Sequence, residues 1–139
     1  MTTPVTSILI IASTSKVKWA TSNQFTGITI PQLAGGEVKL AANQPGNTNI
    51  VTLQANGSKN LEDIKPADIT INVEPPNEGD AWLPSSLFVL GKGAEGDYKM
   101  ICNIPEWPPQ IWLSQDKNDH HFPDAFSSIN LEQVIQATN

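Results

Sequence analysis

The feature that most constrains the fold is a series of short apolar segments separated by turn-forming residues. The clearest segment is Ile69–Glu74, in which Ile69, Ile71 and Val73 alternate with polar residues. Alternation with a period of two is typical of a β-strand that buries one face. The chain also carries eleven prolines and nine glycines, which end strands and form turns. This pattern predicts an all-β protein rather than a helix bundle.

The spacing of these segments predicts about eight strands. The expected strands are 7–14, 17–21, 27–30, 37–42, 50–55, 69–74, 86–91 and 97–103. The first is apolar on both faces, which suits an interior position in a sheet. At the carboxy end, Leu131, Val134 and Ile135 fit a short helix that Asn130 caps, and a last strand is the alternative. With 139 residues, the prediction is one antiparallel β-sandwich domain over residues 1–139.

The segments at 86–91 and 97–103 are expected to form a hairpin. Glycines 91, 93 and 96 are expected to supply positive φ angles in its turn. In its second strand, Tyr98, Met100 and Cys102 are predicted to share the core face. Cys102 is the only cysteine and has no adjacent histidine or basic residue, so we expect a buried, unreactive thiol.

The second half of the chain resembles PLAT/LH2 domains, the β-sandwich modules of lipoxygenases, lipases and polycystin-type membrane proteins. The resemblance lies in W-L-x-x-S-L-F-V, then Y-K-M-I-C-N, then W-L-S-x-D-x-x-D, over roughly 50 residues. The matching positions are Trp82, Tyr98, Cys102, Asn103, Trp112, Leu113, Asp116 and Asp119. An extra IPEWPPQI follows Asn103, and the Gly/Ala-Gly-Thr-Asp signature expected near a PLAT amino terminus is missing. The resemblance implies a sandwich with calcium-assisted membrane contact.

Composition and charge exclude some classes of function. The net charge is −6 and no arginine is present, which argues against nucleic-acid binding. Residues 1–60 hold four lysines and one acid, a balance of +3, whereas residues 61–139 hold four lysines and thirteen acids, a balance of −9. The amino terminus has a short apolar run without a basic lead, so we expect neither a membrane span nor a secretory signal, and synthesis in the cytoplasm. Release or specialised export after synthesis stays open.

Oxygen-bearing side chains in the second half offer a candidate calcium site. Asp116, Asn118 and Asp119, with Asp80 or Asp97, supply the hard ligands that calcium prefers. The alternative is that these groups are solvated. A transition-metal site at Asp116, Asp119, His120 and His121 is a second candidate, with a polar loop as its alternative, because adjacent histidines on an extended chain point in opposite directions.

The segment PEWPPQIW is the candidate binding loop. Its prolines stiffen the backbone, and we expect them to leave Trp107 exposed, with Trp82 or Ile104 assisting it. Trp112 is counted with the binding residues, although the core is its favoured place. A rigid exposed indole enters a lipid boundary or stacks on a sugar or a partner surface. The alternative for Trp107 is that it covers the open end of the core.

Together these observations predict a non-enzymatic module that attaches to a lipid surface or a protein partner through the Trp/Pro loop, with or without calcium. No GxSxG or phosphate-binding glycine loop is present, and the only two histidines are adjacent, which disfavours nucleophilic catalysis. The first alternative is a lectin-like domain that binds a glycan through the same loop. The second is an assembly subunit, such as a toxin component or a particle protein, whose exposed strand edges pair between chains into an oligomer.

Overall fold

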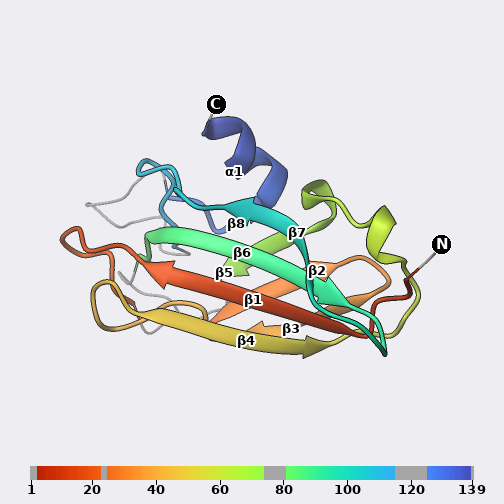
Figure 1. Cartoon of the computed structure of the whole chain (residues 1–139). Coiled ribbons are helices and arrows are strands. Elements are labelled where there is room, and N and C mark those ends of the chain that lie inside the picture. The colour runs from red at the N-terminus through yellow and green to blue at the C-terminus, as the bar shows by residue number, and fades with distance from the viewer. Residues whose placement is uncertain (1–2, 23–24, 74–80, 115–124, 139) are drawn as a thin grey trace.

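The protein forms two four-stranded antiparallel sheets packed face to face. The computed structural model describes residues 3–22, 25–73, 81–114 and 125–138 (Figure 1). One sheet has the order β4 (Thr48–Gln54), β1 (Ser7–Thr14), β6 (Pro84–Lys92) and β7 (Lys99–Ile104). The other has the order β3 (Ala34–Val38), β2 (Thr26–Ile30), β5 (Thr70–Val73) and β8 (Ser128–Asn130). The predicted sandwich of about eight strands is confirmed.

The core lies between the two sheets and follows the alternation in the sequence. Ile8 and Ile10 of β1 and Ile71 and Val73 of β5 are fully buried. Val51 and Leu53 of β4 are half-buried and pack against this core. β1 lies between β4 and β6, which confirms the interior position that its apolar outer face indicated. β1 and β5 bury every second side chain because one face of each sheet is turned towards the shared core.

Helical segments complete the fold. Two 3-10 turns, η1 (Leu61–Asp63) and η2 (Pro66–Asp68), precede β5, and the short helix α1 (Leu131–Ala137) follows β8. The predicted cap is present: Asn130 Oδ1 accepts from the Glu132 amide at 2.9 Å, and the Asn130 amide donates to Gln133 Oε1 at 3.0 Å. Within the described residues, every helix is too short or too polar to cross a lipid bilayer.

The hairpin of β6 and β7 departs from the expected alternation. Val89 pairs with Cys102 but Leu90 pairs with Met100, so Ile101 is an extra residue in a β-bulge. The bulge turns Met100 to the solvent while Cys102 stays buried, so the prediction that both share a face is wrong. Of glycines 91, 93 and 96, only Gly96 has a positive φ, of 98°. Gly91 lies within β6, where a Cβ atom would come 2.9 Å from Ile101 Cδ1.

Two other expected strands differ from the structure. Residues 17–21 form a turn rather than a strand. The strand expected at 37–42 begins earlier, at Ala34, and ends at Val38, because β3 follows β2 after a tight turn.

The two ends of the sandwich carry different connections. β1 ends at Thr14 where β4 and β6 begin, and we call this the Thr14 end (left in Figure 1). Its described connections are residues 15–22, 39–47 and 105–114. The opposite end carries the β6–β7 turn and the two 3-10 turns. Three loop segments thus meet at the Thr14 end, and loops held by a rigid scaffold commonly carry binding residues.

Candidate binding surface

Trp107, the residue expected to be exposed, is part of the core. Its side chain is 5% exposed, and its indole Nε1 donates to the Ile111 carbonyl at 2.8 Å. The Ile111 amide in turn donates to the Pro108 carbonyl at 3.1 Å, so the chain folds back over the indole. The prolines thus shape a turn that covers Trp107 instead of presenting it. The predicted exposure of Trp107 is wrong, although Pro105, Glu106, Pro109 and Gln110 of the same loop are exposed.

The other residues expected to assist binding are also covered. Trp82 and Ile104 are fully buried, and Trp112 is half-buried against the core.

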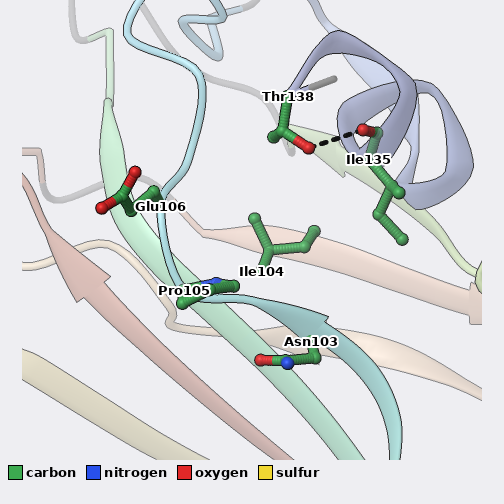
Figure 2. A pocket seen from close by; sticks show the side chains of 6 residues that line it. All are labelled: Asn103, Ile104, Pro105, Glu106, Ile135 and Thr138. Carbon is green, nitrogen blue, oxygen red and sulfur yellow. Dashed lines mark hydrogen bonds between the residues drawn. The ribbon is translucent and has the colours of Figure 1, made fainter.

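A hollow of about 290 Å³ lies beside the end of β7 (Figure 2). Its lining comprises Asn103, Ile104, Pro105, Glu106, Ile135 and Thr138. The Thr138 hydroxyl donates to the Ile135 carbonyl of its own helix, so it is not directed at a ligand. The hollow lacks the convergent polar groups of a ligand site.

The expected calcium ligands are mostly outside the described residues. Asp116, Asn118, Asp119 and Asp80 lie there, as do His120 and His121. Asp97 is exposed in the β6–β7 turn, at the end opposite to Val73, Ala81 and Ser114, which flank those segments. In the described part of the chain, no three histidine, cysteine or acidic side chains lie close enough to hold an ion. The predicted calcium site therefore stays a prediction, since only Asp97 among its residues is described.

One indole is exposed at the Thr14 end, and it is Trp19. Its side chain is 54% exposed. The Ala20 amide donates to the Val17 carbonyl at 3.2 Å, which closes a β-turn with Trp19 in third position. The φ angle of Trp19 is +69°, a value that type II turns normally give to glycine at this position. A bulky residue in this conformation is a genuine outlier.

Backbone hydrogen bonds hold this turn in place. The Ser15 amide donates to the Leu83 carbonyl at 2.9 Å, and the Leu83 amide donates to the Ala20 carbonyl at 3.2 Å. The Ser22 amide donates to the Ala42 carbonyl at 2.8 Å. The turn is thus fixed on both sides to the segments that begin β6 and β4.

A buried threonine joins these segments from below. Thr14 Oγ1 accepts from Trp82 Nε1 at 3.0 Å and from the Ala42 amide at 3.1 Å, and the Thr14 side chain has no exposed surface. The hydroxyl therefore connects β1, the 39–47 connection and the core indole. Trp82, expected to assist binding directly, acts instead as part of the support under the Trp19 turn.

Further apolar and basic side chains lie at the same end. Val17 and Phe25 are each about half exposed. Lys18 Nζ lies 4.6 Å from the centroid of the Trp19 ring, and Lys39 Nζ lies 5.9 Å from that of Phe25. Lys16, which lies against Gly46, is at the same end, and we call these residues together the Trp19 surface. The Trp19 surface comprises Lys16, Val17, Lys18, Trp19, Phe25 and Lys39.

Sequence reasoning missed this surface because the run Lys16-Val17-Lys18-Trp19 alternates as a strand does. The sequence does contain one indication of this surface, which is that lysines alternate with apolar residues. Each apolar residue in the run follows a lysine, and the run sits in the half of the sequence with excess positive charge.

Comparison with known proteins supports the fold. No protein-family model matches the chain, and no curated protein matches its sequence. The alpha toxin of Clostridium absonum superposes with a TM-score of 0.54 and 20% identity over 91% of this chain. The alpha-toxin of Clostridium perfringens, isolated from avian strain SWCP, gives 0.56 and 18% over 91%. This chain has the fold of part of those toxins. It spans 31% of the length of each, and at these identities the likeness shows the fold alone.

Cys102 is an inert thiol in this fold. It is buried, and burial, with a smaller contribution from the Glu132 charge, raises the pKa of the Cys102 thiol to about 11. The thiol of the unfolded chain loses its proton near pH 8.5. The unfolded state therefore binds fewer protons than the folded state between pH 8.5 and 11. Stability from this group is constant below that window and falls as the pH rises through it.

We expect the Cys102 contribution to fall by roughly 3 kcal/mol across this window. The measurement is the difference in unfolding free energy between the natural chain and Cys102→Ala as a function of pH. Subtracting the two curves removes the titration of the lysines. A difference that stays flat from pH 8 to 11 contradicts the buried, protonated thiol, as does rapid reaction of the folded chain with a thiol reagent.

Proposed function

We propose that this chain is a non-enzymatic module of PLAT/LH2 type that attaches to a membrane surface through the Trp19 surface. The observation that carries the proposal is the exposed indole of Trp19, held in a turn position that normally takes glycine. Tryptophan prefers the boundary between lipid headgroups and hydrocarbon, because its ring is apolar and its N–H is polar. Val17 and Phe25 add apolar area at the same end.

The lysines of this surface suit a membrane that carries negative charge. Lys16, Lys18 and Lys39 are exposed at the Thr14 end. Each lysine near an anionic surface contributes about 1 kcal/mol of attraction, and its ammonium group can reach outward while its stem follows the apolar side chains. Although the whole chain is acidic, the Trp19 surface would approach an anionic bilayer with its positive groups first.

The backbone of Trp19 also supports a functional role. A bulky residue in the left-handed region costs on the order of 1–3 kcal/mol, and such conformations concentrate at binding sites. Glycine would remove the cost without changing the turn. We therefore attribute the tryptophan at this position to contact with a membrane rather than to a gain in the stability of the fold.

The wider comparisons are compatible with this proposal. The two proteins that share the fold are called alpha toxins, and the PLAT/LH2 resemblance implies lipid contact. A glycan ligand is less well supported, because the Lys18 ammonium lies over the Trp19 ring that a sugar would stack on. In this proposal the attraction to the membrane comes from the lysines. Calcium assistance stays a prediction, because four of its five predicted ligands lie outside the described residues.

The proposal is tested with vesicles of phosphatidylcholine alone and of phosphatidylcholine with phosphatidylserine. We expect the chain to co-sediment with the anionic vesicles and to bind more weakly as salt increases. Trp19→Gly should weaken binding by roughly tenfold or more, because it removes the largest apolar side chain of the surface. Its melting temperature should not decrease, because glycine relieves the backbone strain.

A matched control is Met100→Ser, which removes a half-exposed apolar side chain from β7. It should bind vesicles as the natural chain does. Binding by Trp19→Gly that equals the natural chain would remove the Trp19 surface from the proposal. If a calcium chelator abolishes vesicle binding, the attraction depends on the ion and not on the lysines.

A further inference from the structure

Among the residues that the structure describes, β4 is the outermost strand of its sheet, and no strand pairs with its outer edge (Figure 1). Among the described strands it pairs only with β1. Its seven residues, TNIVTLQ, contain no charge, no proline and no glycine. Its register with β1 continues without a bulge from Gln54 to Thr48. These are the properties of a strand that can accept another strand at its edge.

The other three sheet edges each have a protective feature. β3 contains two adjacent glycines and a charged Glu37. β7 carries the bulge at Ile101 and a lysine at its start. β8 has three residues. Bulges, charges and short length are the devices that prevent edge pairing in soluble proteins, and β4 has none of them.

The hydrogen bonds that flank the β1–β4 ladder show which backbone groups face the open edge. The Ala55 amide donates to the Thr6 carbonyl at 2.9 Å, and the Thr14 amide donates to the Asn47 carbonyl at 2.9 Å. Since hydrogen-bonded pairs alternate along an antiparallel ladder, the odd-numbered residues of β4 bond to β1. The N–H and C=O groups of Ile50, Thr52 and Gln54 therefore point to the open edge.

The beginning of β4 is less accessible than the rest. The Asn49 side chain donates to the carbonyls of Leu40 and Ala41 at 3.2 and 2.8 Å, so this segment flanks the first residues of the strand. From Ile50 to Gln54 the side chains of the even residues are exposed, and Ile50 is 66% exposed. No described strand is hydrogen-bonded to this part of the edge.

We propose that β4 pairs with β4 of a second copy, antiparallel and centred on Thr52, so that two sheets become one. Around a two-fold axis Thr52 lies opposite Thr52 of the second copy, and Ile50 lies opposite Gln54. The open groups would form about six backbone hydrogen bonds in this register. The occupant is a second copy because the edge is uncharged. Two copies of an acidic chain meet no like-charge pair there, and a basic partner would find no acid to contact.

The proposal is tested by sedimentation equilibrium of the full chain over a wide concentration range. We expect a reversible dimer of twice the 15.0 kDa chain. Thr52→Lys places two ammonium groups opposite each other and should raise the dissociation constant by roughly tenfold or more. Thr52→Val keeps a β-branched side chain and should dimerise as the natural chain does. A natural chain that stays monomeric, or a Thr52→Lys dimer of unchanged strength, overturns the proposal.

A charge exchange tests the register. Ile50→Lys together with Gln54→Lys places like charges opposite each other and should dissociate the dimer. Ile50→Lys together with Gln54→Glu places opposite charges there and should restore it. Amide exchange at residues 50, 52 and 54 should also become slower as the protein concentration rises. If a dimer forms while these amides exchange at a constant rate, the contact lies elsewhere and the proposal is wrong. Melting curves establish that each variant is folded.

Discussion

Replacing Trp107 with alanine should lower the free energy of unfolding by about 3–5 kcal/mol. The indole is buried, and its Nε1 donates to the Ile111 carbonyl, so alanine leaves both a cavity and an unpaired carbonyl. Urea unfolding followed by circular dichroism measures the change. Vesicle binding by the fraction that stays folded should equal that of the natural chain, because Trp107 does not belong to the Trp19 surface.

The control for this variant is Trp107→Phe, which keeps an aromatic ring but loses the hydrogen bond. Its loss of unfolding free energy should be smaller than that of the alanine variant. Because both variants lack the hydrogen bond, the difference between them measures the contribution of a packed aromatic ring. Comparing the two single variants separates fold from function. Trp107→Ala should lose stability, whereas Trp19→Gly should lose vesicle binding. If Trp107→Ala melts as the natural chain does, the indole is not packed as described.

Replacing Thr14 with valine should lower the free energy of unfolding by about 2–6 kcal/mol. Valine has nearly the same shape as threonine but accepts no hydrogen bond. Two buried donors, Trp82 Nε1 and the Ala42 amide, would lose their acceptor, and each unsatisfied donor costs about 1–3 kcal/mol. Because the same hydroxyl joins the supports of the Trp19 turn, vesicle binding should weaken as well. Unfolding curves and the vesicle assay measure the two effects.

Two neighbouring variants make this test specific. Thr14→Ser keeps the hydroxyl and should lose less stability than the valine variant. Ser13→Ala removes a partly exposed hydroxyl that contacts Thr48 Oγ1 at 2.7 Å, and it should change stability by a few tenths of a kcal/mol. Equal stability of Thr14→Val and the natural chain would mean that the two donors find other partners.

The sheets were predictable because their signal is local. Alternation at Ile69, Ile71 and Val73 needs only neighbouring residues to be recognised, and the same holds for the cap of α1 at Asn130 and Gln133. The bulge at Ile101 was not predictable from alternation. It depends on how β7 pairs with β6, where Gly91 leaves room for the Ile101 side chain.

The exposed tryptophan could not be identified from the sequence, because burial of an indole depends on contacts with residues that are distant in sequence. Trp107 is covered by a turn whose carbonyl at Ile111 accepts its N–H. The turn that carries Trp19 is held by a hydrogen bond from the Leu83 amide to the Ala20 carbonyl, and Leu83 lies 64 residues from Trp19 in sequence (83 − 19). The prolines beside Trp107 led to the wrong prediction that it is exposed. Prolines indicate a rigid loop but not the direction in which its side chains point.

The bonds that fix residues 15–22 to Leu83 and Ala42 join backbone groups, so they do not depend on which side chains the turn carries. Lys16, Val17 and Lys18 can therefore be exchanged for other residues while the strands keep their places. Position 19 is restricted by its positive φ angle, which glycine adopts at the lowest cost. The sandwich is in this respect a display scaffold, comparable to the immunoglobulin framework beneath its variable loops. If the proposed function holds, redesigning this one short segment should change the target, and natural divergence has the same freedom.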